Sequence, residues 1–134
     1  MSKIDYKSAG VDIDAGNEAV DRIKDGVKST FTSNVLTGLG GFGSLYDLKP
    51  ILEKYNHPVM VQSIDGVGTK TIIARKLGKF DTIGVDLLSA AANDILVMGA
   101  RPLTFLDYIA NDKLNPDIIE EIVSGMVKAC RDTD

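Results

Sequence analysis

Apolar and polar residues alternate most clearly in two short stretches of the chain, residues 58–64 and 103–109. Side chains of an extended strand point alternately to its two faces, so such a run, rich in β-branched and aromatic residues, predicts a strand. Weaker signals of the same kind lie at residues 43–48 and 80–83. The pattern therefore predicts up to four strands, of which the first two are the clearest.

Elsewhere, apolar residues recur with the spacing of an α-helix. The expected helices cover residues 15–29, 70–77, 83–99 and 116–130. Asp14 and Asn115 are expected to cap the first and the last of these helices, because their side-chain oxygens can accept hydrogen bonds from unpaired backbone N–H groups. Pro116 suits the first turn of the last helix, where no N–H is needed.

Strands and helices in this order predict the α+β fold class, with a mixed four-stranded sheet and helices on one of its faces. The other face, lined by residues such as Val59, Val61, Leu103 and Phe105, would stay apolar and exposed in a monomer. A large exposed apolar patch usually marks an interface. We therefore expect residues 1–134 to form one domain that associates as a homodimer.

Composition limits the possible classes of function. The chain has 134 residues, a net charge of −4 and a pI near 4.9, so it offers no basic cluster for a nucleic-acid backbone. The apolar stretch at residues 83–100 contains Asp86, Asn93 and Asp94 and is too polar to span a membrane. A single cysteine, Cys130, and the absence of an apolar signal core at residues 1–5 favour a cytoplasmic location.

The strongest candidate for chemistry is the segment Asp-Gly-Val-Gly-Thr-Lys at residues 65–70, between a predicted strand and a predicted helix. Its glycines let backbone N–H groups approach an anion, and the helix N-terminus adds a partial positive charge. Lys70 supplies a full positive charge, and Asp65 can hold Mg²⁺. The spacing is not that of a Walker A loop, since Thr69 stands where that motif has glycine. Two alternatives remain, a phosphate site with a divalent metal and a tight turn with surface charges.

A second candidate is the loop at residues 38–43, in which four of six residues are glycine. This density excludes a regular helix and allows the backbone to fold closely over a ligand. Together with the 65–70 segment it is a candidate lid over phosphates. Taken alone, it would be a flexible connector.

The helix expected at residues 83–99 is apolar around most of its axis, which predicts that it is buried. Asp86, Ser89 and Asn93 nevertheless lie on one stripe of this helix, with Asp94 close by. Buried carboxylates are costly unless they are paired or bound to a cation, so the stripe predicts one wall of a ligand or metal site. The alternative is a set of capped or salt-bridged core acids. Asp107, on the last predicted strand, is either a site residue or a structural hydrogen-bond acceptor.

These motifs together resemble a known family. The similarity rests on residues 6–17, 38–43, 65–70, 81–87, 93–95 and 105–108. Their order is similar to that of the phosphoribosylformylglycinamidine cyclo-ligases, also called aminoimidazole ribonucleotide synthetases. The resemblance implies an ATP-dependent enzyme of purine biosynthesis, in which ATP phosphorylates the formyl oxygen of formylglycinamidine ribonucleotide before an internal nitrogen closes the imidazole ring. It also implies a homodimer whose paired amino-terminal sheets form a β-barrel.

The resemblance further implies roles for individual residues. Asp65 and Asp94 match acids that hold Mg²⁺, and Lys70 matches the lysine that contacts phosphate, so Lys70 and Asp65 are the expected catalytic residues. The residues expected to contact ATP are Gly40, Gly41, Gly43, Gly66, Gly68, Thr69, Lys70, Asp86, Asn93 and Asp107.

Members of this family are considerably longer, with a Gly-Gly-Glu-Thr-Ala-Glu segment and a second domain after the part matched here. The resemblance therefore implies an amino-terminal ATP-binding and dimerisation domain that is inactive by itself. One alternative is a non-catalytic nucleotide-binding or dimerisation domain. Another is a different member of the superfamily, such as selenophosphate synthetase or thiamine-phosphate kinase, which is disfavoured because these lack the opening Val-Asp-Ile-Asp-Ala-Gly at residues 11–16.

Overall fold

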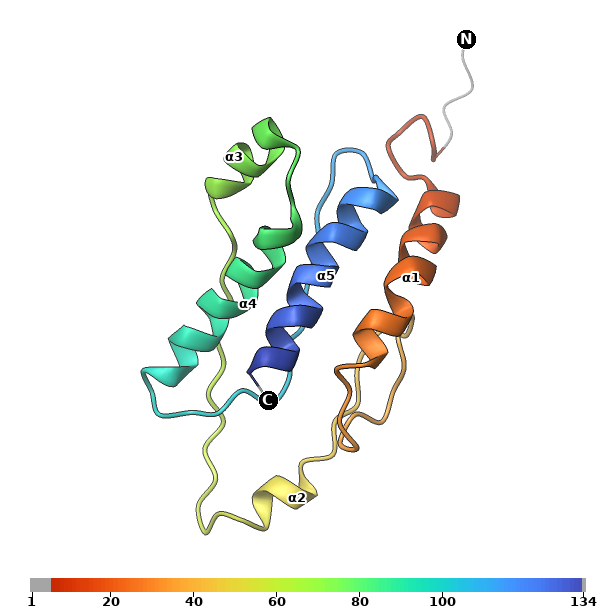
Figure 1. Ribbon diagram of the computed structural model, residues 1–134. Coiled ribbons are helices and arrows are strands. Elements are labelled where there is room, and N and C mark those ends of the chain that lie inside the picture. The colour runs from red at the N-terminus through yellow and green to blue at the C-terminus, as the bar shows by residue number, and fades with distance from the viewer. Residues whose placement is uncertain (1–5, 134) are drawn as a thin grey trace.

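The computed structural model describes residues 6–133, so residues 1–5, on which part of the location prediction rests, lie outside the described range. Five helices occur in the described range: α1 (Ile13–Lys28), α2 (Lys49–Leu52), α3 (Lys70–Leu77), α4 (Asp81–Leu96) and α5 (Pro116–Asp132). Helix α5 lies between α4 and α1 and packs against both, while α3 contacts α4 on the far side (Figure 1). None of the helices within residues 6–133 combines the length and the apolar character needed to cross a bilayer.

The core forms where α1 and α5 meet. Ile119, Val123 and Met126 on one face of α5 are buried together with Ala19 of α1. This is the apolar stripe expected for the last helix, and its partly buried neighbours include Leu87 of α4. Burial of this face holds the three long helices together.

Two helix starts show how far capping could be predicted. Asn115 caps α5 as expected, because its Oδ1 accepts a hydrogen bond of 2.9 Å from the backbone N–H of Asp117. Helix α1 begins earlier than expected, and its cap is Asp12, whose Oδ1 accepts from the N–H of Ala15 at 3.1 Å. The prediction of Asp14 as the cap is therefore wrong, and that residue lies in the first turn.

Helices α4 and α5 cross at two glycines. A Cβ atom on Gly84 would overlap the carbonyl oxygen of Ile122 and lie 2.6 Å from the backbone N of Met126. A Cβ atom on Gly125 would in turn overlap the carbonyl oxygen of Asp81. The two backbones approach so closely because neither glycine has a side chain at the crossing.

The predicted α+β fold with a four-stranded sheet is wrong for this structure, and the β-barrel of paired sheets fails with it. Within residues 6–133 the β-pairing consists of one isolated antiparallel bridge between Val35 and Tyr46. Residues 58–64 and 103–109 run as extended chain without a ladder, and residues 80–83 lie at the start of α4.

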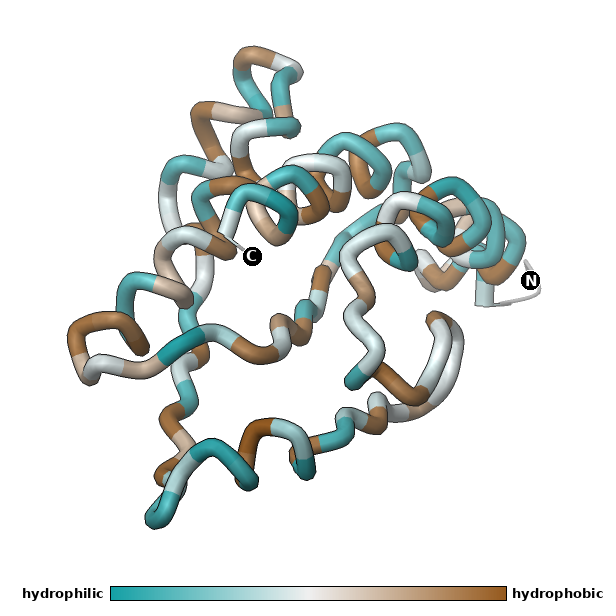
Figure 2. Tube along the Cα trace, turned by 60° about the horizontal axis from the view of Figure 1, so that its bottom comes forward, coloured by the Kyte–Doolittle hydropathy of each residue, from teal (hydrophilic) through white to brown (hydrophobic). Residues whose placement is uncertain are grey.

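The failure has a physical cause. A two-residue alternation specifies an extended backbone, whereas a sheet also needs a second backbone that is distant in sequence and in register. In the segment 103–109, Phe105 and Ile109 pack against the helical core instead. Figure 2 shows that apolar positions recur along the extended chain as well as within the helices. Several of them remain exposed, such as Val59 at 76%, Ile64 at 99% and Tyr108 at 90%.

Candidate functional site

The segment at residues 65–70 forms a turn that leads directly into α3, whose bounds agree with the predicted helix at residues 70–77. Gly68 has a φ of +67°, in the left-handed region that glycine adopts without strain. Its carbonyl oxygen accepts a hydrogen bond of 2.9 Å from Oγ1 of Thr71. Asp65, the two glycines, Thr69 and Lys70 are all exposed, so the turn faces solvent.

An ion pair joins this turn to α4. Nζ of Lys70 lies 3.0 Å from Oδ2 of Asp86, and both side chains remain about half exposed. An exposed pair of this kind adds little to stability, so its main consequence is the position of the Lys70 ammonium group.

The same two residues line a cavity of about 160 Å³ between α3 and α4. The other lining residues are Ile73, Ala74, Leu77, Lys79, Thr82 and Ile83. The cavity thus has an apolar wall and two lysines, of which Lys70 is paired with Asp86.

A second contact links α4 to the chain just before the turn. Oγ of Ser63 donates a hydrogen bond of 2.8 Å to Oδ2 of Asp94. Oδ1 of Asp65, two residues further on, accepts a hydrogen bond of 2.7 Å from the N–H of Gly66. Ser63 therefore holds Asp94 beside the segment that leads into the turn, whereas the hydrogen bond of Asp65 stays within the turn.

The donor set can be compared with what Mg²⁺ requires. The ion usually takes one or two carboxylates and completes its octahedral shell with water and substrate phosphate oxygens. Among residues 6–133 no group of three or more acidic, histidine or cysteine side chains is placed to enclose a metal. Residues 6–133 thus offer no cage made by the protein alone, and a cation held by Asp65 or Asp94 would need further ligands from water or from a substrate phosphate.

The expectation that α4 is buried all round is wrong. Ile83, Gly84 and Leu88 are buried, but Asn93 and Asp94 are exposed. No polar or charged residue is buried in the described part of the chain. The high cost of burying carboxylates therefore does not apply to this stripe, which is a solvent-facing surface of the helix.

The glycine-rich loop does not lie over the turn. In Figure 1, residues 38–43 lie on the α1 side of the molecule, whereas α3 lies beyond α4 on the other side. Gly40 has a φ of +96°, and the loop's neighbour Leu45 donates its N–H to Oγ1 of Thr37 at 2.9 Å. The structure thus keeps Gly40, Gly41 and Gly43 apart from Lys70.

Asp107 forms no hydrogen bond or ion pair with Asp65, Asp86 or Lys70 in the part of the chain that the structure describes. Partial burial raises the pKa of its carboxyl group above the ordinary value, while a hydrogen bond from the backbone N–H of Tyr108 acts in the opposite direction.

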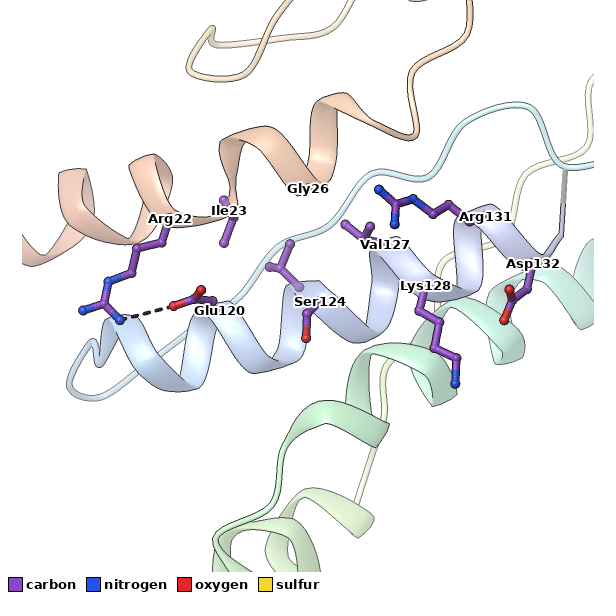
Figure 3. A pocket seen from close by; sticks show the side chains of 10 residues that line it. Arg22, Ile23, Gly26, Glu120, Ser124, Val127, Lys128, Arg131 and Asp132 are labelled. Atoms are coloured by element: carbon purple, nitrogen blue, oxygen red, sulfur yellow. Dashed lines mark hydrogen bonds and ion pairs between the residues drawn. The ribbon is translucent and has the colours of Figure 1, made fainter.

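Another cavity, of about 470 Å³, lies between α1 and α5 and contains none of the predicted site residues (Figure 3). Arg22 at one end donates to Asp117 at 2.5 Å and to Glu120 at 3.2 Å. The hydrogen bonds that Arg22 donates to Asp117 and Glu18 raise its pKa above its already high ordinary value. Since this arginine is already surrounded by carboxylates, the cavity does not provide a free cation there for an anionic ligand.

Sequence reasoning missed Ser63, Lys79 and Thr82. The one signal that could have been used was for Ser63, a small polar residue inside an apolar run and two positions before Asp65. Lys79 and Thr82 reach the site only because α3 and α4 pack against each other.

A glycine-containing turn at a helix start, with a lysine and nearby carboxylates, is typical of domains that bind phosphate groups. The chain belongs to the family described as AIR synthase related protein, N-terminal domain, whose model matches residues 51–134. The resemblance found in the sequence motifs is thus confirmed.

Individual relatives agree with this family. The chain is 53% identical over 134 residues to the phosphoribosylformylglycinamidine cyclo-ligase of Carboxydothermus hydrogenoformans, covering 100% of this chain and 38% of that protein. It is 54% identical over 125 residues to the protein of the same name from Brevibacillus brevis, covering 93% and 36%. The corresponding protein of Rippkaea orientalis is 50% identical over 128 residues, covering 96% and 36%. The chain thus spans little more than a third of the length of these relatives.

Proposed function

We propose that this chain forms the ATP-binding part of a phosphoribosylformylglycinamidine cyclo-ligase. In the proposed reaction, ATP transfers its γ-phosphoryl group to the formyl oxygen of formylglycinamidine ribonucleotide and leaves as ADP. An internal nitrogen then attacks the activated carbon, the imidazole ring closes, and the formyl oxygen departs as phosphate. The proposal rests on two contacts with α4. Lys70, at the end of the turn, pairs with Asp86, and Ser63, just before the turn, donates to Asp94.

Within this proposal, the residues of the turn bind the phosphates of ATP. The backbone of Gly66 and Gly68 can approach closely, and Lys70 places a positive charge beside the group that is transferred. Asp65 and Asp94 would hold Mg²⁺, which supplies neutralisation of the charge on the phosphate oxygens. Thr69, next to Lys70 at the helix start, adds a hydroxyl group within reach of the same ligand.

The remaining predicted ATP contacts have less direct support. Asp86 contacts Lys70, so we assign it to the position of the lysine rather than to the nucleotide itself. Asn93 is adjacent to Asp94 on α4, and its exposed amide is accessible to a ligand there. The 38–43 loop could join the site only after a change in position, and Asp107 has no hydrogen bond or ion pair to the turn within residues 6–133.

We also propose that the 134-residue chain by itself does not turn over substrate. Phosphoryl transfer depends on holding two reactants in line where water is excluded, and such positioning can supply roughly 7–11 kcal/mol of the barrier. Asp65 and Lys70 are exposed, so nothing in residues 6–133 excludes water from the turn.

Self-association is a further part of the proposal. Exposed apolar side chains such as Ile64 and Tyr108 lie along the extended segments, and pairing of two chains would remove them from water. We place the activity in the cytoplasm, with which the free thiol of Cys130 is compatible.

The proposal is tested in a hybrid enzyme, in which this chain replaces the matching segment of the Carboxydothermus relative. Lys70→Ala should lower kcat/KM for ATP at least about 100-fold, as expected for the loss of a charge that stabilises the transition state. Asp65→Asn and Asp94→Asn should each raise the Mg²⁺ concentration needed for half-maximal turnover. Lys49→Ala, which removes an exposed lysine from α2, serves as the matched control and should behave as wild type. Wild-type turnover in all three site variants would disprove the assignment.

A second candidate is a nucleotide-binding domain without catalysis. The position of the 38–43 loop, away from Lys70, favours it. ATP binding by the chain, combined with a hybrid that binds ATP but makes no aminoimidazole ribonucleotide, would support this second function instead.

A further inference from the structure

Ser63 connects two parts of the chain that are 31 residues apart. It lies in the extended segment before the 65–70 turn, and its Oγ donates to Oδ2 of Asp94 on α4 at 2.8 Å. Ser63 itself is half-buried, whereas Asp94 is exposed. The half-buried hydroxyl group donates, and the exposed carboxylate is the group whose position it fixes.

Asp65 and Asp94 are held in a similar way. One oxygen of each carboxylate has a protein donor, the N–H of Gly66 for Asp65 and the hydroxyl of Ser63 for Asp94. Within residues 6–133, the second oxygen of each carboxylate accepts no hydrogen bond from the protein. Each acid thus keeps one oxygen for a ligand.

We propose that Ser63 is a positioning residue for the cation that accompanies ATP. It holds Oδ2 of Asp94, and because Oδ1 has no hydrogen-bond donor within residues 6–133, that oxygen can bind the ion. This inference rests on the proposed function, since it concerns the same site. Partners that orient a metal ligand commonly contribute about 10-fold to 100-fold to metal affinity, which sets the size of the expected effect.

The test measures ATP binding by the 134-residue chain, with Mg²⁺ and with EDTA, by calorimetry or by ligand-observed NMR. The quantity of interest is the Mg²⁺ enhancement, the ratio of the two dissociation constants. Ser63→Ala should reduce this enhancement about tenfold and leave the affinity in EDTA unchanged. Ser63→Thr keeps the hydroxyl donor, so its Mg²⁺ enhancement should equal that of the wild type.

Ser124→Ala is the matched control, because it removes an exposed hydroxyl that donates to the carbonyl of Glu121 at 2.7 Å on α5. Its enhancement should equal that of wild type. A purely structural role of Ser63 would lower the thermal midpoint and leave the enhancement unchanged.

A double-mutant cycle separates the inference from the proposed function. If Ser63 acts through Asp94, then Ser63→Ala should have no further effect on the enhancement in an Asp94→Asn background. An enhancement that falls in Asp94→Asn but is unchanged in Ser63→Ala would overturn the role of Ser63 alone. A wild-type chain without any Mg²⁺ enhancement, or one unaffected by Asp94→Asn, would overturn the proposed metal site itself.

Discussion

The contact between α4 and α5 and the surface around the 65–70 turn both depend on glycine, for different reasons. At the helix crossing, Gly84 and Gly125 have no room for a side chain, because a Cβ atom on either would meet the backbone of the other helix. In the turn, Gly66 and Gly68 have open space around them, and a Cβ atom on either would meet no heavy atom within 4 Å. What distinguishes Gly68 is its positive φ.

The comparison separates packing from conformation. The crossing is a part of the molecule where atoms are close and a small change must move whole helices. The turn is open, so that a ligand can approach its backbone, and it contributes little to the core. Stability is therefore concentrated in α1, α4 and α5, and the candidate chemistry lies at the margin of this bundle.

The largest effect is expected for Gly84→Ala. The added methyl group would overlap the carbonyl of Ile122, and relief requires the two helices to separate, at a cost of about 3 kcal/mol or more. Chemical denaturation of the variant measures the change in unfolding free energy. Gly16→Ala on α1, where nothing lies within 4 Å, should instead gain about 0.5–1 kcal/mol. Equal effects at both sites would contradict the close crossing.

A smaller loss is expected for Gly68→Ala. The new side chain meets no atom, but alanine in the left-handed region costs about 1–2 kcal/mol. Gly66→Ala, with open space and no positive φ, should change stability by less than about 0.5 kcal/mol. If the two variants unfold at the same denaturant concentration, conformation is not what requires glycine in the turn.

The next largest loss of stability is expected when the cap of α5 is removed. Asn115→Ala removes the acceptor for the N–H of Asp117 and should destabilise the protein by about 1 kcal/mol. Asn115→Ser retains a side-chain oxygen and should recover most of the loss, as measured by thermal unfolding. If Asn115→Ala is as stable as the wild type, α5 is held in place by packing alone.

The smallest effect is expected for Asp107→Asn. Partial burial raises the pKa of Asp107 in the folded state, so the folded protein binds this proton more tightly than the unfolded chain does. The resulting penalty is absent at pH values below the ordinary pKa of 3.8, appears as the pH rises through the folded value, and is complete above it. The substitution should therefore raise the thermal midpoint by no more than about 2 °C at pH 7 and have no such effect near pH 3. A stabilisation that is equal at both pH values would point to another cause.

Helices proved more predictable than strands because their information is local. The bounds of α3 agree with the prediction, and Asn115 caps α5 as expected. The errors were a cap displaced from Asp14 to Asp12 and an α4 that is exposed along its polar stripe. A sheet was predicted from alternation alone, and alternation says nothing about which backbone, if any, lies alongside.

For the candidate site, the prediction of the roles of Asp65, Asp94 and Lys70 stays a prediction, while their placement is now described. The structure brings Lys70 to Asp86, and Asp94 to Ser63, but leaves the 38–43 loop on the α1 side of the molecule. The site could be predicted only in part, because a motif names the residues that bind and does not place segments distant in sequence.

The sequence by itself determined the family, the local conformation of the turn at residues 65–70 and the apolar face of α5, since each depends on neighbouring residues. Only the tertiary structure decided that Gly84 and Gly125 lie at a helix crossing, that α4 shows its acids to solvent, and that Ser63 reaches Asp94. These features depend on which helix faces pack together, and that choice depends on apolar surface from segments distant in sequence rather than from any one segment.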